Sequence, residues 1–176
     1  MNKKTKSTAL SGLLTALSVI IMLPTLVIPV LTYVSPMVSG IINIPVIKIS
    51  GKKFAWGVYF ATSLITLILL SDKEASLLYI TFFGYFPIIY KDIGKLKKLF
   101  AAVIKFVLFN LSTVATSFAA IYIFKVPVEE FTDMGKYSVV ILLLLGNVAF
   151  IFYDIAIKKY IPILENTADK LMKNTK

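Results

Sequence analysis

The chain has 176 residues, of which 58% are apolar and 16% are charged, with a formal net charge of +10 and a mean hydropathy of +0.86. Soluble domains are about half apolar and about a quarter charged, so this composition favours a membrane protein. All 19 basic residues are lysines, and the sequence lacks Arg, His and Cys, which excludes disulfides, thiol catalysis, Cys/His metal sites and a Ser-His-Asp triad.

Six apolar segments are predicted to cross the membrane, because about 20 apolar residues span the hydrocarbon core as a helix. The first is longer than the apolar part of a signal peptide and lacks a convincing cleavage pattern, so we expect it to be retained. The spans cover residues 8–31, 35–50, 53–71, 74–90, 97–124 and 135–158. The predicted fold is an all-α integral membrane protein, a single-domain bundle of six transmembrane helices over residues 1–176.

Two of these spans, the second and the fourth, are short, and the second is also interrupted. The second contains Pro36, Gly40 and Pro45, and the fourth contains Gly84 and Pro87. Broken backbone at membrane depth persists only where it packs on protein or lines a cavity. The second span therefore indicates an interior site, and a bend is expected in the inner half of the fourth.

The distribution of lysines predicts the orientation. Most of them precede the first span or follow the second, fourth and sixth spans, whereas the other loops carry few. By the positive-inside rule, the chain is a multi-pass cell-membrane protein with both termini cytoplasmic. Lysines clustered between apolar runs argue against nucleic-acid binding. The cytoplasmic tail, residues 159–176, is expected to be a short amphipathic helix or a solvated segment near anionic membrane lipid.

Small residues recur at a four-residue spacing near the start of the first span, at Thr8, Gly12 and Ala16. Residues at this spacing share one helical face, and small side chains allow another helix to approach closely. The face either packs against helices of the same chain or docks a partner protein.

Four polar residues lie within the fifth and sixth spans. Lys105 and Asp154 are at similar depth, which predicts an ion pair between the two helices, with a proton relay as the alternative. Asn110 and Asn147 lie near mid-depth, and a buried amide needs partners. They either bridge the two helices or bond to a ligand.

Aromatic residues in the outer half of the bundle are candidate walls of a ligand pocket, although Tyr at span ends often only marks the interface. They are Tyr79, Phe83, Phe118, Tyr122 and Tyr137. Glu74, at the outer start of the fourth span, either caps the positive end of that helix or faces the pocket.

The segments SDKEASLLYITFFGYFPIIYKDI, IKFVLFN and GNVAFIFYDIAIKKYIP, together with the small-residue face and the interrupted second span, resemble the substrate-binding S components of energy-coupling factor (ECF) vitamin transporters. The resemblance implies a pocket open to the outside that captures a small nutrient. It also implies docking on a shared membrane coupling subunit with two cytoplasmic ATPases. In that family an Ala-x-x-x-Ala stripe on the first helix contacts the coupling subunit, and Gly12 and Ala16 have the matching spacing.

The pocket implied here would be rich in aromatic rings, amides and hydroxyls, which suits a neutral, flat, hydrogen-bonding substrate such as a pyridine, pyrimidine, purine or nucleoside. SGKK lacks a phosphate-binding glycine-rich loop, so ATP hydrolysis would come from partners. A solitary membrane receptor with the same bundle is the main alternative. We expect no enzymatic activity and no cofactor, because Asp154 is the main acid within the spans. We also expect no channel, because no span carries a polar stripe long enough to line a water-filled path.

Overall fold

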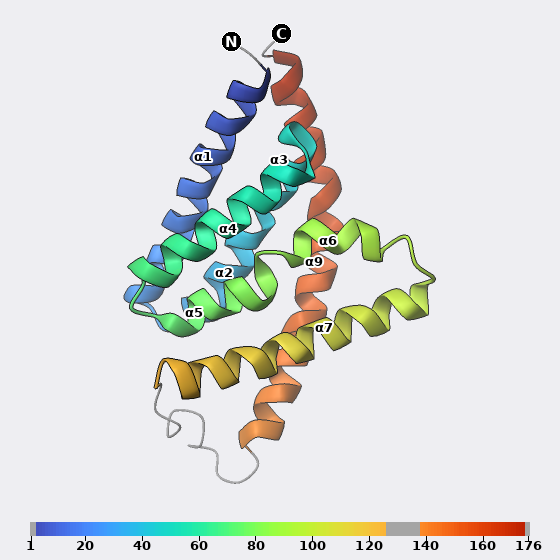
Figure 1. Ribbon diagram of the computed structural model, residues 1–176. Coiled ribbons are helices and arrows are strands. Elements are labelled where there is room, and N and C mark those ends of the chain that lie inside the picture. Colours follow the sequence, from blue (N-terminus) through green and yellow to red (C-terminus); the bar gives the residue numbers. More distant parts are fainter. Residues whose placement is uncertain (1–2, 126–137, 175–176) are drawn as a thin grey trace.

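The computed structural model describes residues 3–125 and 138–174, and every regular element in these ranges is a helix. In chain order the elements are α1 (Lys3–Met22), the 3-10 helix η1 (Leu23–Leu26), α2 (Leu31–Ile41), α3 (Asn43–Ser50), α4 (Lys52–Leu69), α5 (Lys73–Leu78), the π-helical turn η2 (Tyr79–Phe83), α6 (Phe86–Ile93), α7 (Lys98–Phe118), the π-helical turn η3 (Ala119–Ile123) and α9 (Ser138–Asn174) (Figure 1). The all-helical class is confirmed.

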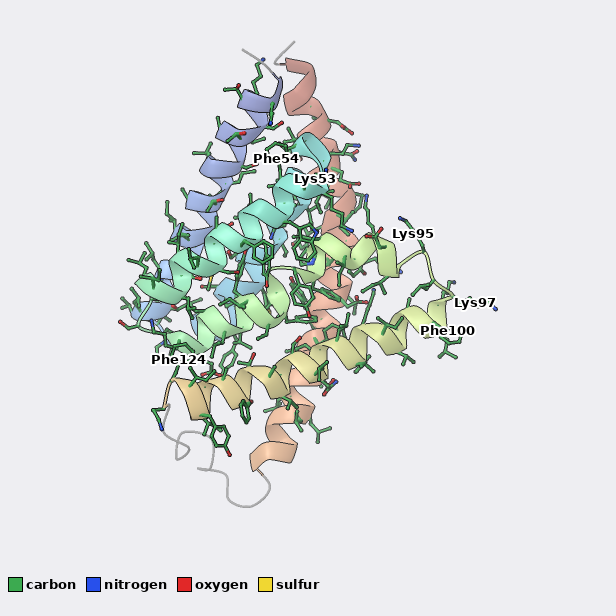
Figure 2. The ribbon with its side chains drawn as sticks, in the orientation of Figure 1. Lys53, Phe54, Lys95, Lys97, Phe100 and Phe124 are labelled. Carbon is green, nitrogen blue, oxygen red and sulfur yellow. The ribbon has the colours of Figure 1, made fainter. Side chains whose placement is uncertain are left out.

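Three segments are long and apolar enough to cross a membrane: Lys4–Leu26, Leu31–Ser50 and Lys98–Ile123. They correspond to the first, second and fifth predicted spans. Large apolar side chains on several helices are exposed, among them Leu13, Ile68, Leu111 and Phe152, and Figure 2 shows Phe100 and Phe124 near opposite ends of the α7–η3 segment. Exposed apolar surface of this extent is typical of contact with lipid. The six-span arrangement and its orientation stay predictions.

The second predicted span is interrupted, as its prolines and glycine indicated. Helix α2 ends at Ile41 and α3 begins at Asn43. Ile42 between them keeps helical backbone angles, so the interruption is a one-residue irregularity, with buried Gly40 two residues before it. The fourth predicted span is also broken, into α5, η2 and α6, and Pro87 lies in the first turn of α6. The start of α1 and the end of α9 lie at the same end of the molecule (Figure 1).

The tail beyond the sixth predicted span does not form a separate element. Helix α9 continues through Pro162 to Asn174 and packs against α3. Ala168 is buried, and Asp169 lies 3.2 Å from the Lys48 ammonium. The stretch is therefore helical, one of the two forms expected from the sequence, and it is held to α3 by buried Ala168 and the Lys48–Asp169 ion pair while most of its other described side chains stay exposed or half-buried.

Two apolar clusters flank the interrupted segment that runs from α5 to α6. One is aromatic and joins η2 and α6 to α7 and α9, with the Phe109 and Phe150 rings stacked at 4.8 Å. The other joins α1, α3, α4 and α5 around Met22 and Val58. Inside a bilayer, close packing and polar contacts between helices carry the association. The interrupted segment therefore lies at the centre of the fold.

Candidate functional site

The two interrupted segments meet with their backbones in contact. A Cβ atom at Gly40 would lie 2.0 Å from the Phe83 carbonyl oxygen, so only a glycine allows α2 to approach η2 this closely. Gly84 is similarly enclosed, because a Cβ there would lie 2.6 Å from the Tyr59 ring. Gly40 therefore allows α2 to meet η2, and Gly84 allows the same interrupted segment to pack against α4.

Side chains from neighbouring helices bond to the carbonyl oxygens of the second interrupted segment. In the π-helical turn the Gly84 amide donates to the Tyr79 carbonyl five residues earlier, at 2.7 Å, and Pro87 has no amide hydrogen to donate. Three side chains donate hydrogen bonds to carbonyl oxygens of this segment. Tyr59 OH donates to the Ile80 carbonyl at 2.8 Å, Ser112 Oγ donates to the Thr81 carbonyl at 2.6 Å, and Asn43 Nδ2 donates to the Gly84 carbonyl at 2.9 Å. Side chains of α3, α4 and α7 therefore stabilise the interruption through hydrogen bonds.

Beside this crossing lie five neutral polar side chains from five elements, which we call the buried polar cluster: Ser18 on α1, Asn43 on α3, Thr62 on α4, Tyr79 on η2 and Tyr153 on α9. All are buried. Their atoms Ser18 Oγ, Asn43 Oδ1, Thr62 Oγ1, Tyr79 OH and Tyr153 OH have no hydrogen-bond partner among the described protein atoms.

The cluster is centred on the last turn of α2. The Tyr79 hydroxyl lies close enough to Asn43, Thr62 and Ser39 to interact with each of them, although none of these contacts has full hydrogen-bond geometry. Ser39 Oγ donates to the Ser18 carbonyl at 3.1 Å, and the Tyr153 hydroxyl is 3.5 Å from the Cβ position of Gly40. The unpaired atoms therefore surround the point where both helices break.

Unpaired buried groups of this kind are chemically informative. Each costs about 1–3 kcal/mol relative to a hydrogen-bonded group, and most buried polar atoms in proteins have partners. Hydroxyl groups can donate and accept, and the Asn43 oxygen accepts. The five side chains thus offer both donors and acceptors beside a crossing of two interrupted helices, a setting in which some transporters place substrate sites.

The structure separates the aromatic residues that were predicted to line one pocket. Tyr79 belongs to the buried polar cluster, and Phe83 is buried with its ring 5.0 Å from that of Tyr153. Phe118 and Tyr122 are 60% and 65% exposed and contact each other at 4.6 Å. They lie on the outer face because α7 and η3 bury Ser112, Thr116 and Ala120 instead. Tyr137 lies outside the described residues.

Two acidic residues lie at the start of the fourth predicted span, with Asp72 as the N-cap residue and Glu74 in the first turn. The Asp72 carboxylate accepts from the Ala75 amide at 3.0 Å and from the Thr32 hydroxyl at 2.7 Å. Glu74, in the first turn of α5, accepts a hydrogen bond from Tyr33 OH at 3.0 Å. Both carboxylates therefore connect α5 to α2, and Glu74 lies outside the buried polar cluster.

The polar residues predicted on the fifth and sixth spans meet each other. Lys105 Nζ is 2.7 Å from Asp154 Oδ1 and 3.9 Å from the centre of the Tyr90 ring. Asn110 and Asn147 form two reciprocal amide bonds of 3.0 and 3.1 Å. Each amide also donates to a carbonyl one turn earlier in its own helix. These groups bridge α7 and α9.

The small-residue face of α1 points away from the rest of the chain. Thr8, Gly12 and Ala16 are all exposed, and no described atom lies within 4 Å of a Cβ placed at Gly12. Packing against helices of the same chain, one of the two sequence-based alternatives, therefore does not occur among the described residues. Docking of a partner stays a prediction.

Sequence reasoning missed Ser18, Asn43, Thr62 and Tyr153. Asn43 carried a usable signal, because an amide between Gly40 and Pro45 marks a polar group at a helix break. Ser, Thr and Tyr are common in membrane helices, and nothing in the local sequence distinguishes a buried one.

Comparison with known proteins found no matching family, no similar curated protein and no similar solved structure.

Proposed function

We propose that this chain is the substrate-binding membrane subunit of an ECF-type uptake transporter. It captures a small, neutral, hydrogen-bonding nutrient, of the vitamin or nucleoside kind, and partner ATPases supply the energy for import. The observation that carries the proposal is the buried polar cluster at the crossing of two interrupted helices. Broken helices near mid-membrane are typical of substrate sites in transporters, and the five neutral polar groups match a neutral ligand.

The exposed face of α1 supports the proposal that the chain docks on a coupling subunit. Thr8, Gly12 and Ala16 present a shallow surface on which a membrane helix of a coupling subunit can pack closely. The chain offers no phosphate-binding loop, so an ATP-driven mechanism depends on such a partner.

Ligand binding is tested on the purified chain by mass spectrometry of co-purifying small molecules and a thermal-shift screen of vitamins and nucleosides. For the ligand so found, Thr62→Val removes a hydroxyl that is unpaired in the free protein and is expected to weaken binding about 5-fold, the value of one hydrogen bond. Thr66→Val is the matched control, because Thr66 lies one turn away, is buried and bonds to the Thr62 carbonyl at 2.8 Å. Equal effects of both variants contradict the site.

Docking is tested separately by co-purification. A coupling subunit and ATPases are expected to accompany the native chain and to be lost in Gly12→Leu and Ala16→Leu, while ligand binding persists. Ligand binding without any such partner, in native membranes, supports the solitary-receptor alternative instead.

A further inference from the structure

A cavity of about 220 Å³ opens between α3, α6 and α9, at the ends of these helices that the lysine distribution predicts to be cytoplasmic. Its apolar part is formed by Ile44, Ile47, Ile88 and Ile161. Its rim is formed by charged residues of α4, α6, α9 and the turn after α6. We call this cavity the lysine groove.

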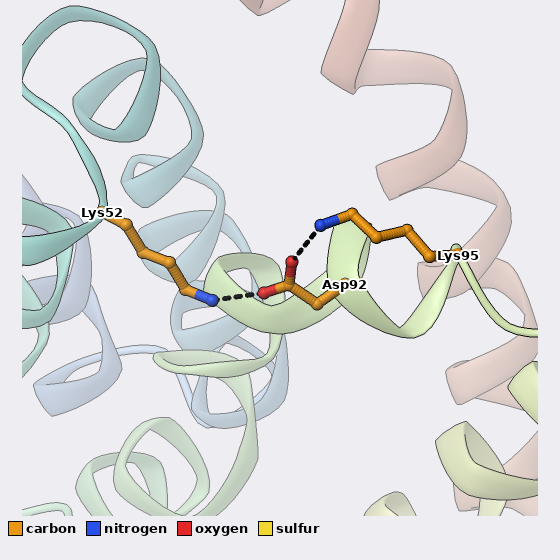
Figure 3. Close-up of polar contacts among 3 residues, drawn as sticks. All are labelled: Lys52, Asp92 and Lys95. Carbon is orange, nitrogen blue, oxygen red and sulfur yellow. Dashed lines mark hydrogen bonds and ion pairs between the residues drawn. The ribbon is translucent and has the colours of Figure 1, made fainter.

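The rim carries more positive than negative charge. Lys52, Lys91 and Lys95 face two acids, Asp92 and Glu165. Lys52 and Lys95 approach the Asp92 carboxylate from opposite sides (Figure 3), and Lys91 pairs with Glu165. The lysines outnumber the acids by one.

A neighbouring shallow hollow extends the groove along α9. It shares Lys91, Lys95 and Ile161 with the groove and adds Lys158. The groove and the hollow together therefore combine lysine side chains with an apolar lining, the two kinds of surface that an amphiphile contacts.

The ion pairs at the rim can exchange partners at little cost. The side chains of Lys95 and Lys91 are 76% and 56% exposed, and ion pairs in contact with water contribute little to stability. A phosphate group that enters the rim can accept hydrogen bonds from these ammoniums while each acid keeps water or a second lysine.

We propose that the lysine groove binds an anionic phospholipid, with the phosphate at Lys91 and Lys95 and part of an acyl chain against Ile47 and Ile161. The single charge of a phosphodiester matches the surplus charge of the rim. A basic pocket between membrane helices on the cytoplasmic side is a recognised setting for anionic lipid head groups. The site is distinct from the buried polar cluster and does not depend on the uptake function.

The test is a lipid titration of the full-length protein in detergent, followed by native mass spectrometry. Phosphatidylglycerol is expected to bind one molecule per chain at least about 5-fold more tightly than phosphatidylcholine. The double variant Lys91→Gln/Lys95→Gln is expected to lose at least about 10-fold, since each lysine near the surface contributes roughly a 5-fold preference.

The matched control is Lys97→Gln/Lys98→Gln, which removes the same charge from exposed lysines at the start of α7 that do not line the groove (Figure 2 labels Lys97). It should retain full phosphatidylglycerol binding. Equal binding of the two lipids, or equal losses in the two double variants, would overturn the proposal.

Two further arms separate the lipid from other partners. Glycerophosphoglycerol, the head group without acyl chains, and inorganic phosphate should not displace the lipid at equal concentration. Displacement by either would assign the groove to a soluble anion and overturn the lipid. So would a protein partner that is lost in Lys91→Gln/Lys95→Gln while phosphatidylglycerol binding is unchanged.

Discussion

The polar contacts between α7 and α9 and the buried polar cluster occupy the same bundle but differ in completeness. Between α7 and α9, Lys105 is paired with Asp154 and the Asn110 amide with that of Asn147. In the cluster, by contrast, five side-chain atoms have no partner among the described residues. A completed polar contact holds helices together in a membrane, whereas an unpaired buried group lowers stability and points to a ligand.

The largest effect is expected where the two interrupted segments touch. Gly40→Ala places a methyl group 2.0 Å from the Phe83 carbonyl oxygen, next to rigid backbone. It should lower the free energy of unfolding by about 3 kcal/mol, at the upper end of overpacking effects. The measurement is thermal unfolding in detergent.

Gly57→Ala on α4 is the matched control, because Gly57 is exposed and no described atom lies within 4 Å of its Cβ position. It should leave stability unchanged or raise it by up to about 1 kcal/mol, through helix propensity. Similar stability of the two variants would mean that α2 and η2 are further apart than described.

The ion pair between α7 and α9 is expected to show the next largest effect. Asp154→Asn leaves the Lys105 ammonium, whose side chain is only 13% exposed, without its counter-charge. We expect a loss of about 2 kcal/mol, less than for a fully buried pair because Asp154 is 31% exposed. Adding Lys105→Met should restore much of it. A double variant as unstable as Asp154→Asn alone would rule out a direct pair.

The amide bridge is expected to be weaker. Asn110→Ala leaves one donor and one acceptor of Asn147 unpaired, at a cost of about 1 kcal/mol. Replacing both residues, as Asn110→Leu/Asn147→Leu, should be close to neutral, because no polar group is then stranded. Additive losses in the double variant would contradict a reciprocal bridge.

The smallest effect concerns pH and the rim of the lysine groove. The ammoniums of Lys52 and Lys95 lower the pKa of Asp92 from 3.8 to about 2. Because the folded-state pKa is depressed, the contribution of Asp92 to stability is present above pH 4 and is lost as the pH falls toward 2. The difference in unfolding temperature between the native chain and Asp92→Asn should therefore shrink from pH 5 to pH 2.5. A constant difference would show that the carboxylate has no charged partner.

The helices and the contacts between α7 and α9 could be predicted because long apolar runs and isolated charges or amides stand out in a sequence. The positions of the aromatic residues could not. Phe118 and Thr116 are two residues apart on one helix, and which of them is buried depends on how α7 rotates against η2. The buried polar cluster combines side chains from five elements, so it exists only after the interrupted segments meet at Gly40 and Phe83.

The measurement that tests the central claim most directly is the behaviour of Tyr79→Phe in two assays, thermal unfolding and binding of the identified ligand. Because the Tyr79 hydroxyl is buried and unpaired in the free protein, its removal should leave stability unchanged or raise it by about 1 kcal/mol. Ligand binding should weaken about 5-fold or more. A variant that is clearly less stable and binds the ligand normally would show that Tyr79 is an ordinary structural residue, and would contradict the account.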